Sequence, residues 1–253
     1  MNRKIILSYV IVFLAIWTVN AQKKSEAKVQ QSSSANPGTD LFEHYMKVYD
    51  QASIKYNDFA VARNALYSMI ALRPDRLGLK DTLAYLYFNS NNYLQVILLG
   101  NEILETNPAR SEILELVAVS EQNLGLQKNA LESFEKLYAL TKDVYHKYNI
   151  ASLQYMLKRY GECSESLNSI LSSTDSLGDV TISNNQGESQ KVPLKAAAFN
   201  MRGVIALEIN QIDVARQNFQ KALELFPEFT LAKGNLEMAN GKENEAPPQK
   251  KDK

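Results

Sequence analysis

The sequence has few of the residues on which most catalytic and metal sites depend. Its 253 residues include one cysteine, Cys163, and two histidines, His44 and His146, about one hundred residues apart. A single cysteine cannot form an internal disulfide, so packing alone must stabilise the fold. Neither histidine has the nearby carboxylate and second histidine that mark a metal site on a helix. The sequence therefore predicts no metal site.

Phosphate-binding and nucleophile motifs are missing as well. The chain has no glycine-rich phosphate loop, no Cys-x-x-Cys pair and no nucleophile elbow. Its 28 basic and 28 acidic residues balance, with no basic stripe for nucleic acid and no acidic block for a polycation. We therefore expect no catalytic residue, no cofactor and no nucleic-acid partner.

The longest apolar run stands at the very start of the chain. Asn2-Arg3-Lys4 gives a positive beginning, Ile5 to Val19 is uncharged, and Val19-Asn20-Ala21 places small residues where a signal peptidase reads. These features predict a signal peptide over 1–21, and hence export, to the periplasm of a Gram-negative cell. The run is shorter than the roughly 20 residues that a membrane span needs, although an uncleaved inner-membrane anchor is an alternative. A lipoprotein is not expected, because no cysteine lies near the cleavage point.

Two polar segments flank the part that should fold. Residues 22–38 have almost nothing apolar to bury, and residues 241–253 are polar and contain proline. Such segments cannot offset the entropy lost on ordering, so we predict a disordered leader and a disordered tail. Order should begin at Thr39-Asp40, which are good N-cap residues, and extend over 39–240.

A period of about 34 residues runs through this ordered part. The most regular copy spans 196–229 and holds Gly203, Ala215, Phe219, Ala222 and Pro227 at fixed spacing. Earlier copies span 43–76, 77–110, 111–143 and 144–177. The pattern resembles the tetratricopeptide repeat, a helix-turn-helix unit of 34 residues.

The repeated positions have a physical reason. Small residues let the two helices of a unit approach closely, and larger ones fill the space between neighbouring units. The small residues are Ala84, Ala118, Ala151 and Gly203 in the first helices and Ala62, Ala130, Cys163 and Ala215 in the second; the larger ones are Leu66, Phe134, Leu167 and Phe219. Cys163 is therefore expected to be buried and inert. Asp50 and Gly100 break the pattern, which predicts less regular packing in the first two units.

An insertion of about 18 residues separates the fourth and fifth copies. Apolar and polar residues alternate on both sides of a turn cluster in 178–195, which predicts a β-hairpin. A three-residue loop at 186–188 would set Val180 opposite Leu194 and Ile182 opposite Val192. An isolated hairpin is marginally stable, so it must dock on the helices.

The last predicted element is a capping helix. In 229–240, Phe229, Ala232, Leu236 and Ala239 share one face, as expected of a helix that covers the end of an array. The predicted fold is thus all-α, a right-handed superhelix of about five tetratricopeptide repeats with an inserted β-hairpin and a C-terminal capping helix.

The resemblance also implies a binding surface, because first helices line the concave face in this family. Asp81, Glu112 and Glu115 belong to this lining. Its aromatic and amide residues offer contact area and hydrogen bonds to a peptide. The predicted protein-binding residues are Tyr85, Phe88, Asn89, Asn123, Tyr148, Tyr155 and Asn200. The alternative is that some of these tyrosines pack between helices. Lys47 matches one lysine of the family's carboxylate clamp, but Glu112 and Leu116 stand where basic groups are needed.

The favoured function is a non-enzymatic scaffold that binds a peptide or protein partner in this face. Resemblance to exported tetratricopeptide proteins implies service to an outer-membrane assembly or secretion complex. A second hypothesis is an architectural subunit that docks through its hairpin or convex face. A third is an enzyme or glycan-processing accessory. The sequence does not give the oligomeric state. It predicts contact with a membrane only through the signal segment, if that segment stays uncleaved.

Overall fold

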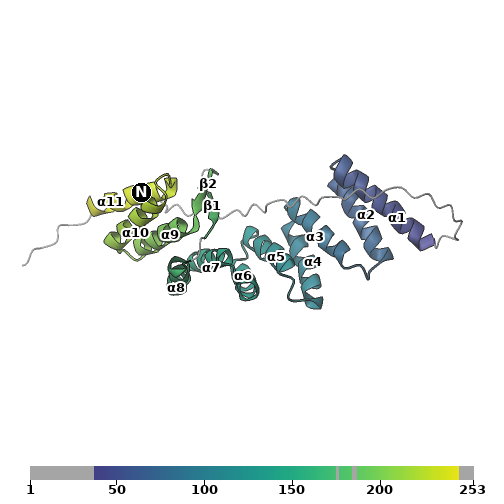
Figure 1. Cartoon of the computed structure of the whole chain (residues 1–253), viewed down its shortest axis with the longest axis horizontal. Coiled ribbons are helices and arrows are strands. Elements are labelled where there is room, and N and C mark those ends of the chain that lie inside the picture. The colour runs from purple at the N-terminus through teal and green to yellow at the C-terminus, as the bar shows by residue number, and fades with distance from the viewer. Residues whose placement is uncertain (1–36, 175–176, 184–186, 245–253) are drawn as a thin grey trace, which may run out of the picture. The chain divides into compact units, whose positions relative to one another are not determined.

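The computed structural model describes residues 37–244 except 175–176 and 184–186 (Figure 1). The predicted signal peptide over 1–21, most of the leader and residues 245–253 lie outside this part. The described chain divides after Gly125 into an N-terminal unit and a C-terminal unit. Within the described ranges, no helix is both long and apolar enough to cross a membrane.

The N-terminal unit is built from antiparallel helices joined by short turns. In order they are α1 (Pro37–Asp50), continued by the π-helical turn η1 (Gln51–Lys55), then α2 (Phe59–Leu72), α3 (Gly78–Asn89), α4 (Tyr93–Thr106) and α5 (Ser111–Asn123). Each helix packs against the next. One buried cluster joins α1, α2 and α3, and a second joins α3, α4 and α5.

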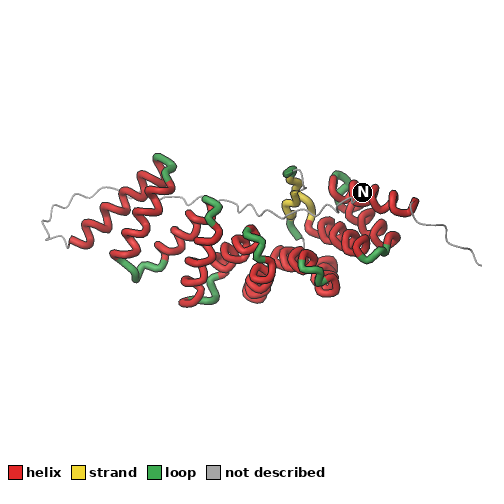
Figure 2. Tube along the Cα trace, turned by 180° about the vertical axis from the view of Figure 1, so that it is seen from behind, coloured by secondary structure: helices red, strands yellow, loops and turns green. Residues whose placement is uncertain are grey.

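The C-terminal unit adds six helices and a small antiparallel sheet. They are α6 (Gln127–Thr141), α7 (Val144–Met156), α8 (Tyr160–Ser172), β1 (Asp179–Ser183), β2 (Ser189–Pro193), α9 (Leu194–Glu208), α10 (Ile212–Leu225) and α11 (Thr230–Asn244). Figure 2 shows the strands in yellow between red helices. The predicted all-α fold with an inserted hairpin and a final helix is confirmed.

Three element ends differ from the predicted boundaries. Helix α1 begins at Pro37, inside the predicted leader, because proline is tolerated in the first turn of a helix. Helix α9 begins at Leu194 instead of Ala196, directly after Pro193. Helix α11 runs to Asn244, four residues into the predicted tail, so Gly241 does not end it. Glycine weakens a helix by only about 1 kcal/mol.

The turn inside every repeat depends on one residue with a left-handed backbone. The φ angle is 55° at Asn57, 57° at Asn91, 73° at Gly125, 60° at Lys158 and 59° at Asn210. Asparagine and glycine adopt this conformation at little cost. These residues fix where the first helix of each repeat stops and the second begins.

The small repeat residues allow close helix approach, as predicted. Ala62, Ala84 and Ala118 have no exposed surface, and a Cβ atom added to Gly203 would lie 2.6 Å from Cδ1 of Phe219. The thiol of Cys163 is fully buried and donates to the carbonyl oxygen of Ala151 at 3.0 Å. Burial raises the pKa of this thiol to about 12, which keeps it protonated.

The two positions that break the pattern behave differently. At Gly100 the packing is not loose: a Cβ atom there would overlap with Val117, so the missing side chain brings α4 against α5. The departure from the repeat pattern therefore takes the form of a closer helix approach at this position. At Asp50, which is exposed, the helix widens into η1 before the chain turns. The first repeat therefore has the irregular end that its sequence predicted.

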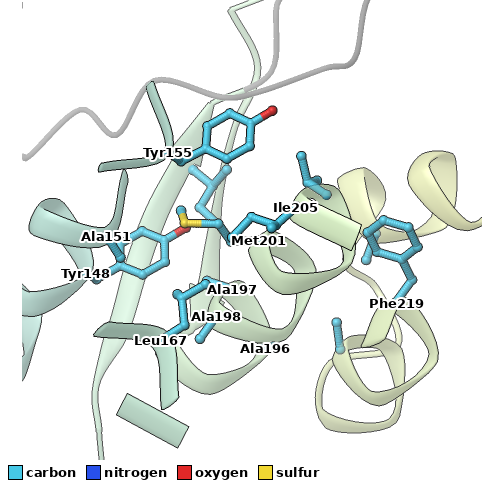
Figure 3. Close-up of a cluster of buried hydrophobic side chains, with 14 of the residues drawn as sticks. Tyr148, Ala151, Tyr155, Leu167, Ala196, Ala197, Ala198, Met201, Ile205 and Phe219 are labelled. Carbon is cyan, nitrogen blue, oxygen red and sulfur yellow. The ribbon is translucent and has the colours of Figure 1, made fainter. Parts of the chain in front are cut away.

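Helix α9 lies at the centre of the C-terminal unit. It packs against α7, α8, α10, α11 and both strands, and its three consecutive alanines at 196–198 have no exposed surface. Figure 3 shows this cluster, with Met201 beside Tyr148 and Ala151. A helix that is apolar on nearly every side must be covered on every side. The hairpin and α11 provide part of that cover.

The hairpin has a different register from the predicted one. Val180 pairs with Val192 and Ile182 pairs with Gln190, so each partner is two residues earlier than expected. Leu194 is the first residue of α9 and cannot also belong to the strand. Val180, Ile182 and Val192 are nonetheless buried against α9, so the hairpin docks on the helices as predicted.

Candidate functional site

In the N-terminal unit, α3 and α5 present polar and aromatic side chains on one face. We call this surface the Tyr85 face and define it by Asp81, Tyr85 and Asn89 of α3 with Glu112 and Glu115 of α5. Residues four apart on a helix share a face, so Asp81, Tyr85 and Asn89 form one row. Tyr85 is 40% exposed, so part of its ring is accessible to a ligand.

The electrostatic field at this face is negative. Burial, followed by the carboxylates of Glu112, Asp81 and Glu115, raises the pKa of the Tyr85 hydroxyl, and Arg110 opposes them. Arg110 lies at the base of the face, where its guanidinium donates to Oδ2 of Asp81 at 2.9 Å. Three carboxylates thus lie close enough to raise the pKa of the Tyr85 hydroxyl, and one guanidinium offsets their charge in part. The arrangement suits a positively charged ligand.

The other predicted residues of this unit have mixed positions. Asn89 and Asn123 are exposed and each is the last residue of its helix; Nδ2 of Asn123 donates to the carbonyl of Val119 at 2.8 Å. Phe88 is half-buried and packs edge-on against Tyr93, with 5.9 Å between ring centroids. Leu116 is fully buried, so it belongs to the core and could not have been a clamp position.

In the C-terminal unit, the predicted residues lie mostly inside the protein. Tyr148 is 3% exposed and belongs to the core around α9 (Figure 3). Oδ1 of Asn200 accepts a hydrogen bond from Asn235 of α11 at 3.0 Å, and both residues are buried. The structure therefore places Tyr148 and Asn200 in packing positions that a ligand could not reach.

Tyr155 is also largely buried, at 9% exposure. Its hydroxyl donates to Oε1 of Glu208 at 3.2 Å, and its ring packs against Tyr160 at 5.7 Å. Burial, followed by the charge of Glu208, raises the pKa of this hydroxyl. Of the seven predicted residues, the structure leaves Tyr85, Asn89 and Asn123 exposed.

Solved structures resemble this fold, although no family model matches the chain and no curated protein is similar in sequence. A tetratricopeptide repeat protein from Parabacteroides merdae ATCC 43184 superposes with a TM-score of 0.60 at 16% identity, covering 81% of this chain and 76% of that one. YrrB, a TPR protein with an unusual peptide-binding site, gives 0.59 at 14% identity, covering 79% and 97%. MamA from Desulfovibrio magneticus RS-1 gives 0.57 at 12% identity, covering 76% and 98%.

This chain has the tetratricopeptide-repeat fold. At such low identity the likeness extends to the fold alone.

Some residues that shape the surfaces of this tetratricopeptide protein were not singled out from the sequence. Tyr160 stands at the start of a second helix and Asn235 on the final helix, so neither belongs to a first-helix face. Asp81, Glu112 and Glu115 were counted in the lining, yet only the structure shows that their charges act on Tyr85. A signal was present, since Asp81 precedes Tyr85 by one turn of the same helix and the two glutamates lie on the first helix of the next repeat.

Residues suited to nucleophilic or metal chemistry are scattered. Cys163 is buried with a protonated thiol, and His146 is buried beside Phe134, with a pKa lowered by burial. His44 is exposed on α1 beside Tyr45. Across the described ranges, no three His, Cys, Asp or Glu residues gather as metal ligands would.

Proposed function

We propose that this protein is a non-enzymatic scaffold that binds a basic segment of a protein partner at the Tyr85 face. The observation that carries the proposal is a partly exposed aromatic ring whose hydroxyl lies in the negative field of Glu112, Asp81 and Glu115. Tyrosine is enriched at binding hot spots because it offers a large contact area with a hydrogen-bonding hydroxyl. YrrB, which shares the fold, has a peptide-binding site.

Charge complementarity gives the class of partner. A lysine or arginine side chain laid over the Tyr85 ring would gain a cation–π contact. Its charged head would lie within reach of Glu112 and Glu115, which can accept charge-assisted hydrogen bonds. The amides of Asn89 and Asn123, at helix ends, can bond to peptide groups.

An unsatisfied acceptor supports the same partner. Oδ1 of Asp81 is buried and accepts no hydrogen bond among the described residues, while Oδ2 is held by Arg110. Arg110 donates only to Oδ2, so the Asp81 carboxylate keeps part of its negative charge at this face, which favours a basic ligand.

The proposal is tested by photocrosslinking in the native cell. A photoreactive phenylalanine replaces Tyr85 in one strain and Leu98 in a control strain, since Leu98 is 64% exposed on α4 of the same unit. We expect a discrete crosslinked protein from position 85 and none from position 98. A peptide spanning the crosslinked segment then serves as the probe for titration against the purified protein.

Two variants separate the contribution of the Tyr85 ring to binding from that of the carboxylates in this titration. Tyr85→Ala should weaken binding about tenfold or more, as expected for a hot-spot aromatic. Glu112→Gln combined with Glu115→Gln should weaken it about tenfold at low salt and much less at 0.5 M salt, where charges are screened. Equal binding by all three proteins, or an acidic crosslinked segment, would overturn the proposal.

We also propose that the protein is exported and works in the periplasm, as an accessory of an outer-membrane assembly or secretion complex. The support is the sequence of residues 1–21. Cell fractionation with N-terminal sequencing tests it: we expect periplasmic protein beginning at Gln22. Protein in the cytoplasm that retains Met1 would refute export.

A further inference from the structure

Within the part of the chain that the structure describes, one edge of the β-hairpin has backbone groups that form no hydrogen bond to another element. Hydrogen-bonded pairs alternate with non-bonded pairs in an antiparallel ladder. The N–H of Leu194 donates to the carbonyl of Gly178 at 3.1 Å, just beyond the sheet. Because Gly178 and Leu194 form a bonded pair, the Val180–Val192 and Ile182–Gln190 pairs are bonded too. Asp179, Thr181 and Ser183 must then direct their backbone groups away from β2.

Two further observations agree with this assignment. Pro193 has no N–H and pairs with Asp179, at a place where the ladder requires no donor. The hydroxyls of Ser183 and Ser189 are 2.7 Å apart, as expected for a non-bonded pair, whose side chains lie closer together. No backbone bond from Asp179 or Thr181 to any other described element is present.

The two edges of the hairpin are protected unequally. The outer row of β2 contains Lys191, which is exposed, and Pro193, both of which discourage strand addition. Strand β1 contains neither lysine nor proline between Asp179 and Ser183. In its outer row Asp179 is exposed, Thr181 is half-exposed and Ser183 is buried, so the accessible part of this edge lies at Asp179 and Thr181. The β1 edge is therefore the one that an added strand could pair with.

The hairpin is also held rigidly. The Gln190 side chain donates to the carbonyl of Glu228 at 2.5 Å and accepts from the N–H of Thr230 at 3.2 Å, which ties β2 to the start of α11. Nζ of Lys195 donates to the carbonyl of Ser173 at 2.6 Å, which joins the two ends of the insertion. A fixed edge loses little freedom when a ligand binds.

We propose that the outer edge of β1 binds an extended segment of a protein partner as a third strand. Main-chain hydrogen bonds to Asp179 and Thr181 would supply the affinity, because Ser183 is buried. Alternate side chains of the segment would lie beside Val180 and Ile182, which are buried, so apolar and β-branched residues fit there. The opposite face would meet Asp179, which favours a basic residue. This surface is separate from the Tyr85 face.

Matched proline variants test the pairing. Thr181 and Lys191 are directly opposite each other, and the N–H of each points away from the ladder. Thr181→Pro removes a donor from the β1 edge, and Lys191→Pro removes the equivalent donor from the β2 edge. Neither breaks a bond within the hairpin, and both preceding residues are already extended, as proline requires.

The experiment selects binders from a phage-displayed library of random ten-residue peptides, using the full chain as target. Selected peptides should have apolar residues at alternate positions. Their affinity, measured by fluorescence anisotropy, should fall about tenfold or more on Thr181→Pro, as for the loss of a buried hydrogen bond. It should stay within about twofold on Lys191→Pro. Thermal melts of both variants show whether each is folded.

A measurement on the unchanged protein makes the test independent of the variants. Bound peptide should slow hydrogen exchange at the Thr181 amide and leave the Lys191 amide unaffected. Enrichment of no peptide, equal binding to both variants, or an unprotected Thr181 amide would overturn the proposal. Concentration-dependent self-association that Thr181→Pro abolishes would assign the edge to a second copy of the chain instead.

Discussion

The close approach of α9 and α10 at Gly203 leads to a sharp prediction. A Cβ atom on Gly203 would lie 2.6 Å from Cδ1 and 2.8 Å from Cζ of Phe219, distances that real Cβ atoms do not show. Phe219 has no exposed surface, so its ring cannot swing into solvent. Gly203→Ala must therefore push α10 away from α9 or force the ring off its rotamer.

The magnitude follows from two opposing effects. Alanine stabilises a helix interior by about 1 kcal/mol relative to glycine. Overpacking a core with one methyl group costs about 1–3 kcal/mol. Because three carbons of one buried ring are involved, the upper part of that range applies. We expect Gly203→Ala to lower the free energy of unfolding by about 1–2 kcal/mol.

Gly234 provides the control, because it is exposed in α11 and an added Cβ atom there would meet nothing within 4 Å. Gly234→Ala should therefore raise stability by about 0.5–1 kcal/mol. Urea unfolding followed by circular dichroism at 222 nm measures both variants. Replacing Phe219 by Leu should remove most of the difference in a double-mutant cycle. If Gly203→Ala were as stable as Gly234→Ala, the proposed close packing would be wrong.

Three other changes have calculable consequences. Gln190→Ala should destabilise the protein by about 1–2 kcal/mol and speed exchange of the Thr230 amide, because two backbone groups lose their partner; Lys191→Ala, one residue away, should be neutral. Asp58→Ala should cost about 1 kcal/mol in urea unfolding, because its side chain accepts from the N–H of Val61 at the start of α2; an unchanged midpoint would show that this cap contributes nothing. Cys163→Ala should flatten the dependence of the free energy of unfolding on pH above pH 9. The thiol ionises near pH 9 in the unfolded chain and near pH 12 in the folded protein, so between these values the free energy of unfolding of the native protein falls, relative to the variant, by about 1.4 kcal/mol per pH unit. Parallel profiles for the two proteins would contradict the assigned burial.

The helix pairs could be predicted because their packing is encoded locally. Ala84 of a first helix and Ala62 of a second helix are both buried, as the spacing of small residues in the repeat predicted. Turn residues such as Asn57 and Asn91 have left-handed backbones that few residue types adopt. Such features recur in every repeat, so comparing the copies within one sequence is sufficient to predict the helices and the turns between them.

The hairpin register could not be predicted in the same way, because two elements compete for one residue. Leu194 continues the alternating pattern of β2, but it also starts a run of apolar and small residues that forms α9. Strand periodicity cannot show that a helix takes this residue. The missing N–H of Pro193 could not decide either, because a shift of two residues keeps Pro193 at a non-bonded position in both registers.

The binding face was only partly predictable because equivalent positions serve different purposes in different repeats. Phe88 and Tyr155 are both the twelfth residue of their repeat, and each packs against the tyrosine that opens the second helix, at 5.9 Å and 5.7 Å. That position therefore stabilises the turn within a repeat. Packing against these tyrosines leaves Phe88 half-buried and Tyr155 largely buried, so both rings offer less surface to a ligand than their spacing suggested.

The fifth position of the repeat shows the complementary effect. Tyr148 and Asn200 occupy it in the C-terminal unit and are buried around α9, whereas Asp81 and Glu115 occupy it in the N-terminal unit and stay half-exposed. The hairpin and α11, which cover α9, have no counterpart beside α3 among the described residues. Because exposure depends on these added elements, the same spacing yields core in one unit and surface in the other. An exposed aromatic ring with carboxylates around it remains at α3, and for this reason the Tyr85 face, and not a continuous row of tyrosines, is where a ligand should bind.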